Sequence, residues 1–515
     1  MHKLSVIAAA AALLAGCTME PWYHRPEAPV SQSFPQGGVY ATQPVAGGAN
    51  GQNGQAAPSA NGAAATDIGW REFFVDPRLQ QLVDIALKNN RDLRVSVLNV
   101  EAARAQYQIT RAELFPAING VATDTRTRTP RDLLTTPNSP NPYSVYNVGV
   151  QASWELDFWG RIRSLKDQAL AQYLSTAYAR KAAEITLVSE VADQYLTMLS
   201  DDELLKVTQE TLKTAQDSYN IAKAQFDTGT GTELDLRQAQ TVVENAQANM
   251  QAQLRARAQA ENALVLLIGE PLPADLPQGL PLDGQPLVND IPAGLPSDLL
   301  TRRPDIMQAE QTLLAANANI GAARAAFFPK ISLTAAFGTE SLSLGGLFKA
   351  GTAAWSFVPQ ITLPIFEGGS NIANLQLANV EKRIEIANYE KSIQSAFREV
   401  ADGLAARGTY DEQIAALERS TFANQRSLTL SELRYKNGVD SYLPVLAAQT
   451  SLYTAQQSLV TARLARLTNL VDLYRALGGG WIAHAGETPR EPDAPADYGA
   501  ASAPAAASAA TATAG

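Results

Sequence analysis

The sequence predicts a mixed α and β membrane protein built as two tandem structural repeats. Three copies are expected to form a 12-strand outer-membrane β-barrel, four strands per chain, continued by a long α-helical barrel with coiled-coil packing. Three observations lead to this fold class: an internal duplication, alternating segments with one apolar face, and helical stretches too long for a compact domain.

Composition excludes several classes of function. The chain has 515 residues, a formal net charge of -10 and a pI near 5.1, a poor match for a nucleic-acid partner. Its histidines, His2, His24 and His484, lie near the ends, so the periodic body has no histidine base or histidine metal site. Cys17 is the only cysteine, so no disulfide forms within one chain. We expect no cofactor and no metal site.

The N-terminus predicts export and lipidation. Residues 1–16 read as a signal peptide, because a basic start precedes an apolar run at 4–15 that is too short to span a bilayer. The end of this segment resembles the bacterial lipobox, whose cysteine is acylated after cleavage: Leu14-Ala15-Gly16-Cys17. Cys17 is therefore the expected lipidation site of a palmitate-bearing lipoprotein. The alternative is an ordinary secretory signal with Cys17 incidental.

The segments flanking the periodic body are expected to carry little regular structure. Residues 17–69 form a lipidated N-terminal tether. Within it, residues 31–66 are rich in glycine, alanine and small polar residues, so they are either a flexible tether or an extended wrap. Residues 482–515 form a disordered tail of mostly alanine, proline, serine and threonine.

The periodic body is duplicated. At an offset of 213, Phe115-Pro116 matches Phe328-Pro329, and at an offset of 209, Gly229 matches Gly438. Each register holds over a whole segment, which marks a duplication rather than chance. The first repeat is expected at 70–290 and the second at 291–481, joined by a proline-rich stretch that starts near Pro271.

Each repeat contains two segments that alternate like strands. From Tyr146 to Phe158 the even positions are apolar and the odd ones polar, and the same period returns from Trp355 to Ile365. Weaker alternation follows the two Phe-Pro pairs. Strands are therefore expected at about 117–128, 144–158, 330–340 and 354–366. One wholly apolar face fits an outer-membrane barrel, although a soluble sandwich would share it.

Four long helices are expected, at 161–227, 233–268, 371–436 and 442–477. The first has no proline or glycine and would reach about 100 Å at 1.5 Å per residue. Its apolar residues step by three and four from Ile185 to Phe226, which predicts a coiled-coil seam. Gly403 and Gly408 weaken the middle of the third helix. Soluble scaffolding coiled coils share these features.

The turns between paired helices are expected to form hairpin tips. Gly229 and Gly438 lie where an arriving helix needs a left-handed residue to end it. Thr232 and Asp235 predict a capping box for the second helix. In the second copy Asp440 or Ser441 is expected to cap, with Pro444 tolerated in the first helical turn.

Four strands cannot close a barrel, and unpaired strand edges in lipid cost several kcal/mol per group. The chain is therefore expected to form a homotrimer, which supplies about 12 strands in contact with outer-membrane lipid.

The motifs together resemble the outer membrane factor family, the TolC-like channels, and most closely its OprM-like lipoprotein branch. Besides the lipobox and the two Phe-Pro pairs, the resemblance rests on Leu156-Asp157-Phe158-Trp159-Gly160-Arg161, Arg302-Arg303-Pro304-Asp305-Ile306 and Ala476-Leu477-Gly478-Gly479-Gly480-Trp481. It implies a trimeric outer-membrane exit duct of a tripartite efflux pump, passing small molecules such as drugs and contributing to antibiotic resistance. The implied partners are a periplasmic adaptor and an inner-membrane efflux transporter.

The expected sites follow from this resemblance. The adaptor would dock on the tips, formed by Thr228, Gly229, Thr230, Asn437, Gly438 and Val439. The family often closes its duct with a leucine and an aspartate one turn later; Leu443 matches the leucine, but Ala447 stands at the next position. An apolar Leu443 constriction is therefore favoured, with Asp440 and Asp235 as the nearest carboxylates.

Glu155 and Asp157 are expected to form a charge ring in the lumen that favours cations. A catalytic carboxylate pair is the weaker interpretation, and we expect no enzyme. Two alternatives to drug efflux remain: a lipid-anchored periplasmic coiled-coil scaffold without a pore, and a duct for metal or protein export. The substrate cannot be read from the sequence, and its five methionines form no metal ladder.

Overall fold

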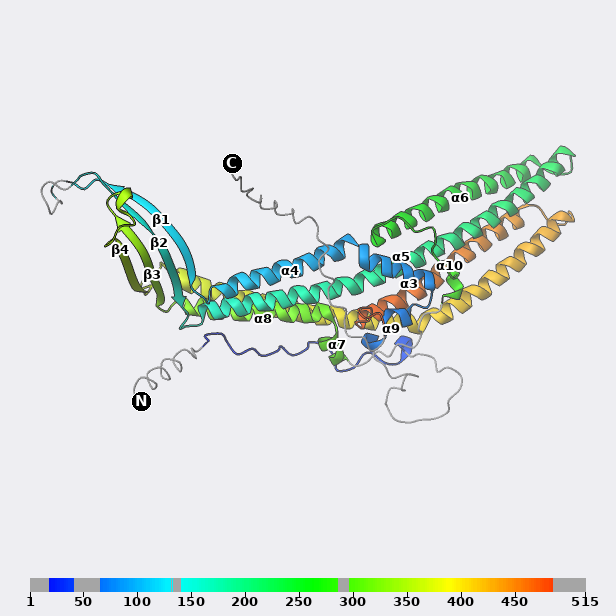
Figure 1. Ribbon diagram of the computed structural model, residues 1–515. Helices are drawn as coiled ribbons and strands as arrows, with labels where there is room; N and C mark the ends of the chain where they lie inside the picture. Colours follow the sequence, from blue (N-terminus) through cyan, green and yellow to red (C-terminus); the bar gives the residue numbers. More distant parts are fainter. Residues whose placement is uncertain (1–17, 41–64, 131, 133–139, 286–295, 485–515) are drawn as a thin grey trace, which may run out of the picture. The chain divides into compact units, whose positions relative to one another are not determined.

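The computed structural model describes residues 18–40, 65–130, 132, 140–285 and 296–484 (Figure 1). The expected signal peptide, Cys17 and the tail beyond residue 484 lie outside these residues. So do most of the 31–66 stretch and part of the first strand-to-strand loop.

The described elements follow the order expected of two repeats. The short helices η1 (Gly38–Tyr40) and η2 (Ala65–Asp67) precede the first repeat, which opens with α2 (Trp70–Phe73) and α3 (Pro77–Asn89). The first repeat continues with α4 (Arg91–Ala112), β1 (Ala117–Thr127), β2 (Tyr143–Leu156), α5 (Arg161–Asp227) and α6 (Glu233–Ile268). The second contains, after η4 (Leu282–Gly284), the elements α7 (Pro296–Arg302), α8 (Pro304–Ala325), β3 (Lys330–Ser341), η5 (Leu344–Gly346), β4 (Ala353–Thr362), α9 (Ser370–Lys436) and α10 (Leu443–Ala476).

The duplication is visible in the lengths of the elements. Helices α4 and α8 each have 22 residues and start 213 positions apart, while α5 and α9 each have 67 residues and start 209 positions apart. Gly160 and Gly369, directly before α5 and α9, both have a positive φ, 75° and 88°. The two offsets differ because the β1–β2 loop is longer than the β3–β4 loop.

The two repeats are not two compact units. One compact unit combines residues 1–29, 100–178 and 306–392, and the other combines 30–99, 179–305 and 393–515. Each unit therefore draws on both repeats, and the chain passes from one unit to the other within α4, α5, α8 and α9. The expected halves at 70–290 and 291–481 describe the duplication in sequence but not the compact units.

The four strands form one antiparallel sheet in the order β1-β2-β3-β4 (Figure 1). Residues directly opposite one another share a face of a sheet. The register places most of the large apolar side chains on one face, including Ile118 opposite Ala152, Val150 opposite Phe337, Trp154 opposite Leu333, and Ala335 opposite Phe357. The other face is mostly polar. A sheet with this division fits a strand wall between lipid and a wet interior.

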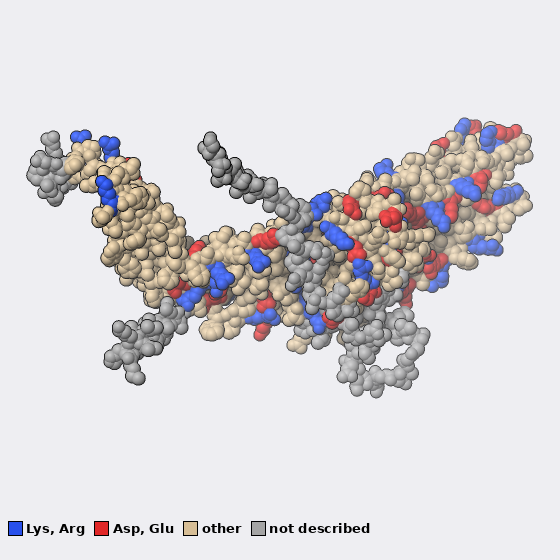
Figure 2. Space-filling view, in the orientation of Figure 1, with Lys and Arg blue, Asp and Glu red and all other residues tan. Residues whose placement is uncertain are grey.

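Charged residues lie only near the ends of the strands. Glu155 and Lys330 lie at the end of the sheet where β1 starts, whereas Asp124, Arg126 and Glu340 lie towards the opposite end. Figure 2 shows the surface over the strands as largely uncharged between these ends. An uncharged band with charged margins is what a membrane-spanning sheet needs.

Two strands end earlier than expected. β2 stops at Leu156. The carboxylate of the following residue, Asp157, accepts a hydrogen bond from the backbone N–H of Arg163 in the first turn of α5 (2.9 Å), so Asp157 belongs to the start of the helix rather than to the strand. β4 stops at Thr362, four residues before the expected end at 366. Its last expected residues have no neighbouring strand within the chain, since β3 starts at Lys330, opposite Thr362.

The coiled-coil seam of α5 is buried along most of its length. Val188, Ala192 and Tyr195 are at most 1% exposed, and Ala215 and Ala222 are equally covered. The last expected member, Phe226, is 40% exposed, because it lies in the final turn next to the tip. The seam therefore holds the helices together up to the tips but not within them.

Asp76 organises the packing around α3 and was not singled out by the sequence analysis. This carboxylate is 1% exposed and caps α3 by accepting from Arg78 N. It also accepts from Tyr195 Oη (2.9 Å), Leu280 N (3.2 Å) and Gln285 Nε2 (2.9 Å). The Asp76 carboxylate thus links α5 and the 280–285 segment to α3. These hydrogen bonds offset the cost of burying its charge.

The Arg302–Ile306 motif is structural. Arg303 is 7% exposed, and its guanidinium pairs with Asp305 and with Glu399 of α9. It also donates to the carbonyl oxygen of Ala476 at the end of α10 (2.9 Å). The motif therefore joins α8, α9 and α10 at one buried point.

The N-terminal segment lies along α8. Three α8 residues spaced seven apart, Glu310, Asn317 and Arg324, form one stripe on the helix. Arg324 donates to the carbonyl of Met19, and Asn317 to that of Pro21. Glu310 accepts from Arg25 at 2.7 and 2.8 Å and from Tyr23 at 3.2 Å. Residues 19–25 thus form a strap along α8.

Candidate gate and docking tips

The two tips share one backbone geometry. Gly229 and Gly438 have φ values of 77° and 69°, as expected for left-handed helix ends. In each tip the N–H after the glycine donates back to a carbonyl in the last turn of the helix. Thr230 N donates to Gln225 O and Val439 N to Arg434 O, both at 2.9 Å. The duplication therefore produced two equal turns.

The starts of the two returning helices differ. Thr232 caps α6 by accepting from Asp235 N (3.1 Å), and its hydroxyl donates to the Asp235 carboxylate (2.7 Å), so the expected capping box is present. Helix α10 starts after Tyr442 without a side-chain cap, so the prediction that Asp440 or Ser441 caps it is wrong. Pro444 lies in the first turn, as expected.

Asp440 has another partner. The Arg434 guanidinium donates to its carboxylate, with 3.1 Å between Nη2 and Oδ1, and this hydrogen bond lowers the pKa of Asp440. The two carboxylates that the sequence analysis placed nearest the gate are therefore engaged: Asp440 with a cation, and Asp235 with a hydroxyl. Neither is a free negative charge that would by itself open the tips by repulsion.

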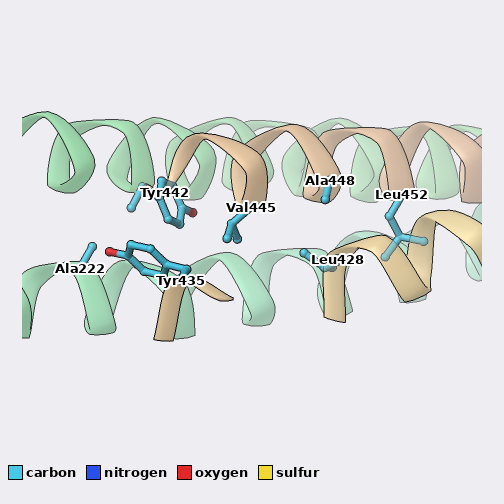
Figure 3. Packing of buried hydrophobic residues seen from close by; sticks show 8 residues of the cluster. Ala222, Leu428, Tyr435, Tyr442, Val445, Ala448 and Leu452 are labelled. Carbon is cyan, nitrogen blue, oxygen red and sulfur yellow. The ribbon is translucent and has the colours of Figure 1, made fainter. Parts of the chain in front are cut away.

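Beneath the tips lies an apolar cluster drawn from α5, α6, α9 and α10 (Figure 3). Its members are Ala222, Ala239, Leu428, Tyr435, Tyr442, Val445, Ala448 and Leu452. The rings of Tyr435 and Tyr442 meet edge to face with centroids 5.3 Å apart. Leu443, next to buried Tyr442, points outward and is 57% exposed. Leu443 therefore takes no part in the apolar core of the chain.

Hydrogen bonds between the two helical hairpins cross this cluster. Tyr435 Oη donates to Gln225 Oε1 (2.6 Å), and Gln449 Nε2 donates to Ser218 Oγ (3.0 Å). Tyr442 Oη in turn donates to Gln449 Oε1 (3.3 Å). The sequence analysis missed these residues, although Gln449 belongs to the duplicated register after the tip. The links couple the positions of the α5–α6 and α9–α10 tips.

The six expected docking residues are all exposed: Thr228, Gly229, Thr230, Asn437, Gly438 and Val439. A Cβ added to Gly229 or Gly438 would meet nothing within 4 Å. A side chain at either glycine would therefore strain the backbone and project into solvent without disturbing the packing of the chain.

Glu155 and Asp157 do not form an uncompensated pair of charges. Glu155 pairs with Arg161 (2.9 Å) and Lys330 (2.8 Å), and Asp157 pairs with Arg163 (3.2 Å). Their side chains are 17% and 9% exposed. Compensated, largely covered carboxylates are a weak source of cation selectivity, so we revise that expectation. They instead join the sheet to α5.

In the described ranges, none of the helices has both the length and the apolar character needed to cross a membrane. Among the same residues, no group of three or more histidine, cysteine, aspartate or glutamate side chains could hold a metal ion.

A sheet with one apolar face, joined to two long helical hairpins, defines the class of an outer-membrane channel with a helical extension. The model of the outer membrane efflux protein family matches residues 82–270 and 295–479, one match in each repeat. The chain belongs to this family.

Similar proteins agree with this assignment. The chain is 47% identical over 487 residues to the antibiotic efflux pump outer membrane protein ArpC and to the toluene efflux pump outer membrane protein TtgC, both of Pseudomonas putida. Each match covers 94% of this chain and 97% of the relative. The open-state structure of the Neisseria gonorrhoeae MtrE outer membrane channel matches with a TM-score of 0.78 and 42% identity, over 92% of this chain and 100% of that one.

The protein is accordingly an outer-membrane exit duct of an efflux pump, and it assembles as a homotrimer. The four strands of one chain are its share of the trimeric barrel, and the long helices continue that barrel. The family consists of channels rather than enzymes. The alternative of a scaffold without a pore is not supported.

Proposed function

We propose that this duct completes a tripartite pump, in which a periplasmic adaptor docks on the two exposed tips and an inner-membrane transporter delivers the substrate. The observation that carries the proposal is the pair of equal turns around Gly229 and Gly438. Both are exposed, and both leave space for a closely approaching partner. The expected adaptor contacts are the six tip residues Thr228, Gly229, Thr230, Asn437, Gly438 and Val439.

The resting duct is sealed by an apolar ring. Three copies of Leu443, exposed at the first position of α10, would meet near the axis and exclude water without an ion pair. Asp440 and Asp235 are nearby but already bonded to Arg434 and Thr232. The adaptor would open the ring by moving the helix ends outward, and the Tyr435–Gln225 link would carry that movement from one hairpin to the other.

The substrates we propose are small molecules that include antibiotics and aromatic solvents, because relatives spanning nearly the whole chain are named for antibiotic and toluene efflux. To test this, the chain would be expressed with its adaptor and transporter in a strain without an exit duct. We expect tolerance of both classes to rise several-fold only when all three proteins are present. Unchanged tolerance, with the trimer present in the outer membrane, would contradict the proposed substrates.

We also propose that Cys17 carries the lipid anchor. Cys17 lies two residues before Met19, the first residue of the strap, and Met19 is hydrogen-bonded to Arg324, one residue before the end of α8. Five residues beyond Ala325, the end of α8, the strand β3 starts at Lys330. The strap therefore directs the N-terminus toward the end of the sheet at which the chain enters the membrane.

Replacing Cys17 tests how much the anchor contributes. Because one acyl chain binds membranes only weakly whereas a closed barrel is held firmly, Cys17→Ser should still form outer-membrane trimers, in reduced amount. Membrane fractionation and trimer gels would measure this. Release of the whole Cys17→Ser population as soluble protein would contradict a membrane-inserted sheet.

A further inference from the structure

Helices α5 and α10 pack antiparallel within each chain, and four contacts fix the register of this α5–α10 seam. From the tips downward these are Ser218 with Gln449, Thr208 with Tyr453, Glu203 with Arg463, and Ile185 with Gly480. Asp193 lies eight residues after Ile185, and Asp472 lies eight residues before Gly480. The register therefore places the carboxyl groups of Asp193 and Asp472 at the same level of the seam.

One carboxyl oxygen of Asp193 is covered in this seam without a hydrogen-bond partner. Within the part of the chain that the structure describes, Asp193 Oδ1 is buried and makes no hydrogen bond. Arg475 of α10 lies near enough to act on it, but its guanidinium donates to Asp472 Oδ1 instead (3.0 Å). The nearby carboxylate of Asp76, by contrast, accepts four hydrogen bonds. A covered carboxyl group without a partner favours its neutral form, because only the charged form loses strong hydration on burial.

The electrostatic surroundings act in the same direction. Burial raises the pKa of Asp193, the negative charges of Asp472 and Glu190 raise it further, and Arg475 lowers it, with the result that the pKa reaches about 7. Asp193 thus titrates near neutral pH, whereas an aspartate in water has lost its proton by about pH 5.

The other elements that contact this part of α5 hold their charges in hydrogen-bonded pairs. Gln194 donates to a backbone carbonyl of α6 (3.0 Å), and on that helix Arg257 donates to Glu261 (2.8 Å). Tyr195 donates to Asp76, which precedes α3 (2.9 Å). Burial and the charges on α10 and α5 therefore govern the titration of the carboxyl group.

We propose that Asp193 is a proton-operated switch in the seam between the two helical hairpins of each chain. In its neutral form the carboxyl group stays buried, and the α5–α10 seam is closed. When the proton leaves for water, the carboxylate has no partner in its buried position and must move toward solvent or toward Arg475. That movement loosens the seam, so the helical part of the duct is firmer in mildly acidic surroundings and looser in alkaline ones.

The direction of the pH dependence follows from proton linkage. An aspartate of the unfolded chain binds its proton only below about pH 4, whereas Asp193 of the folded chain keeps it up to about pH 7. Between these values the folded state holds the extra proton. The stability that Asp193 contributes is therefore fully present below about pH 4 and is lost as the pH rises to about 7.

Asp193→Asn tests the switch, because asparagine has nearly the shape of the neutral acid but cannot ionise. The thermal midpoints of purified wild-type and variant trimers would be measured by tryptophan fluorescence from about pH 5 to about pH 9. We expect the midpoint of Asp193→Asn to rise relative to wild type by several degrees between about pH 5 and pH 7, and the difference to stay constant above that.

The duplication supplies the matched control. Asp402 of α9 lies 209 residues after Asp193, is largely exposed and pairs with Arg398 at 3.8 Å. Asp402→Asn should therefore follow the wild-type midpoint at every pH. Asp472→Asn guards against an Asp193 variant that fails to assemble: it removes one negative charge beside Asp193 and should give a smaller rise over the same pH range.

Midpoint differences that do not change with pH for both Asp193→Asn and Asp472→Asn would overturn the proposal. An equal rise in Asp402→Asn would overturn it too, because it would show a general effect of removing negative charge. Neither adaptor nor exported compound takes part in these measurements, so their outcome is independent of the proposed function.

Discussion

Leucine at position 438 should abolish efflux while leaving the trimer intact. The φ of Gly438 is 69°, a conformation that costs a side-chain-bearing residue roughly 1–2 kcal/mol. The tip has no neighbour within 4 Å of an added Cβ, so the core and the sheet should be unaffected. The bulky, misplaced tip would block the adaptor. Tolerance of exported compounds should fall to that of a strain without the duct, with normal amounts of trimer.

Asparagine at the same position is the matched control. Asparagine enters the left-handed region far more readily than leucine, and its side chain is short and polar. Gly438→Asn should therefore retain most of the efflux and most of the adaptor binding in pull-down experiments. Normal efflux by Gly438→Leu, with the turn still in place, would show that the adaptor binds elsewhere on the helices.

Serine at position 443 should have the opposite effect. If three Leu443 side chains form the seal, a smaller polar residue admits water and lowers the barrier to ions. The conductance of isolated Leu443→Ser trimers should rise several-fold in planar bilayers, and cells should become sensitive to large antibiotics without an adaptor. Stability should change little, because Leu443 is 57% exposed in the chain.

The duplication supplies the control for this variant. Leu234 occupies the equivalent position at the start of α6 and is 66% exposed. Leu234→Ser removes the same side chain from the other hairpin and should leave conductance unchanged. Equal increases from both variants would mean a general loosening of the tips rather than the loss of a ring at Leu443.

The sequence was most informative where periodicity decides the structure. Helix α5 spans Arg161–Asp227 and α6 spans Glu233–Ile268, the ranges that the helical period and the glycine turns indicated. The turns at Gly229 and Gly438 were equally predictable, because a left-handed helix end is a local property of the backbone.

The partners of polar side chains could not be read in the same way. The Asp440 carboxylate was expected to cap α10, yet it accepts hydrogen bonds from Arg434, six residues earlier. The local pattern favours neither of these two partners. Glu155 and Asp157 were expected as free lumen charges, but pairing with Lys330 requires knowing that β2 and β3 are neighbours. The four hydrogen bonds to Asp76 involve residues up to 209 positions away.

The end of β4 marks a different limit. Alternation predicted a strand to residue 366, but the single chain ends it at Thr362. The alternation of apolar and polar residues fits a strand inside a closed trimeric barrel. In a single chain, β4 is an edge strand with no neighbour on its outer side. Exposed Ile365 and Phe366 are therefore informative about the assembly rather than exceptions to the pattern.

The most direct test of a sealed exit duct is the conductance of the purified wild-type trimer in a planar bilayer. We predict discrete channels that are mostly closed and that open more widely when the adaptor is added on the side of the helical tips. A trimer that inserts stably but shows no conductance steps, with the adaptor or with the Leu443→Ser substitution, would contradict a continuous pore sealed at the tips.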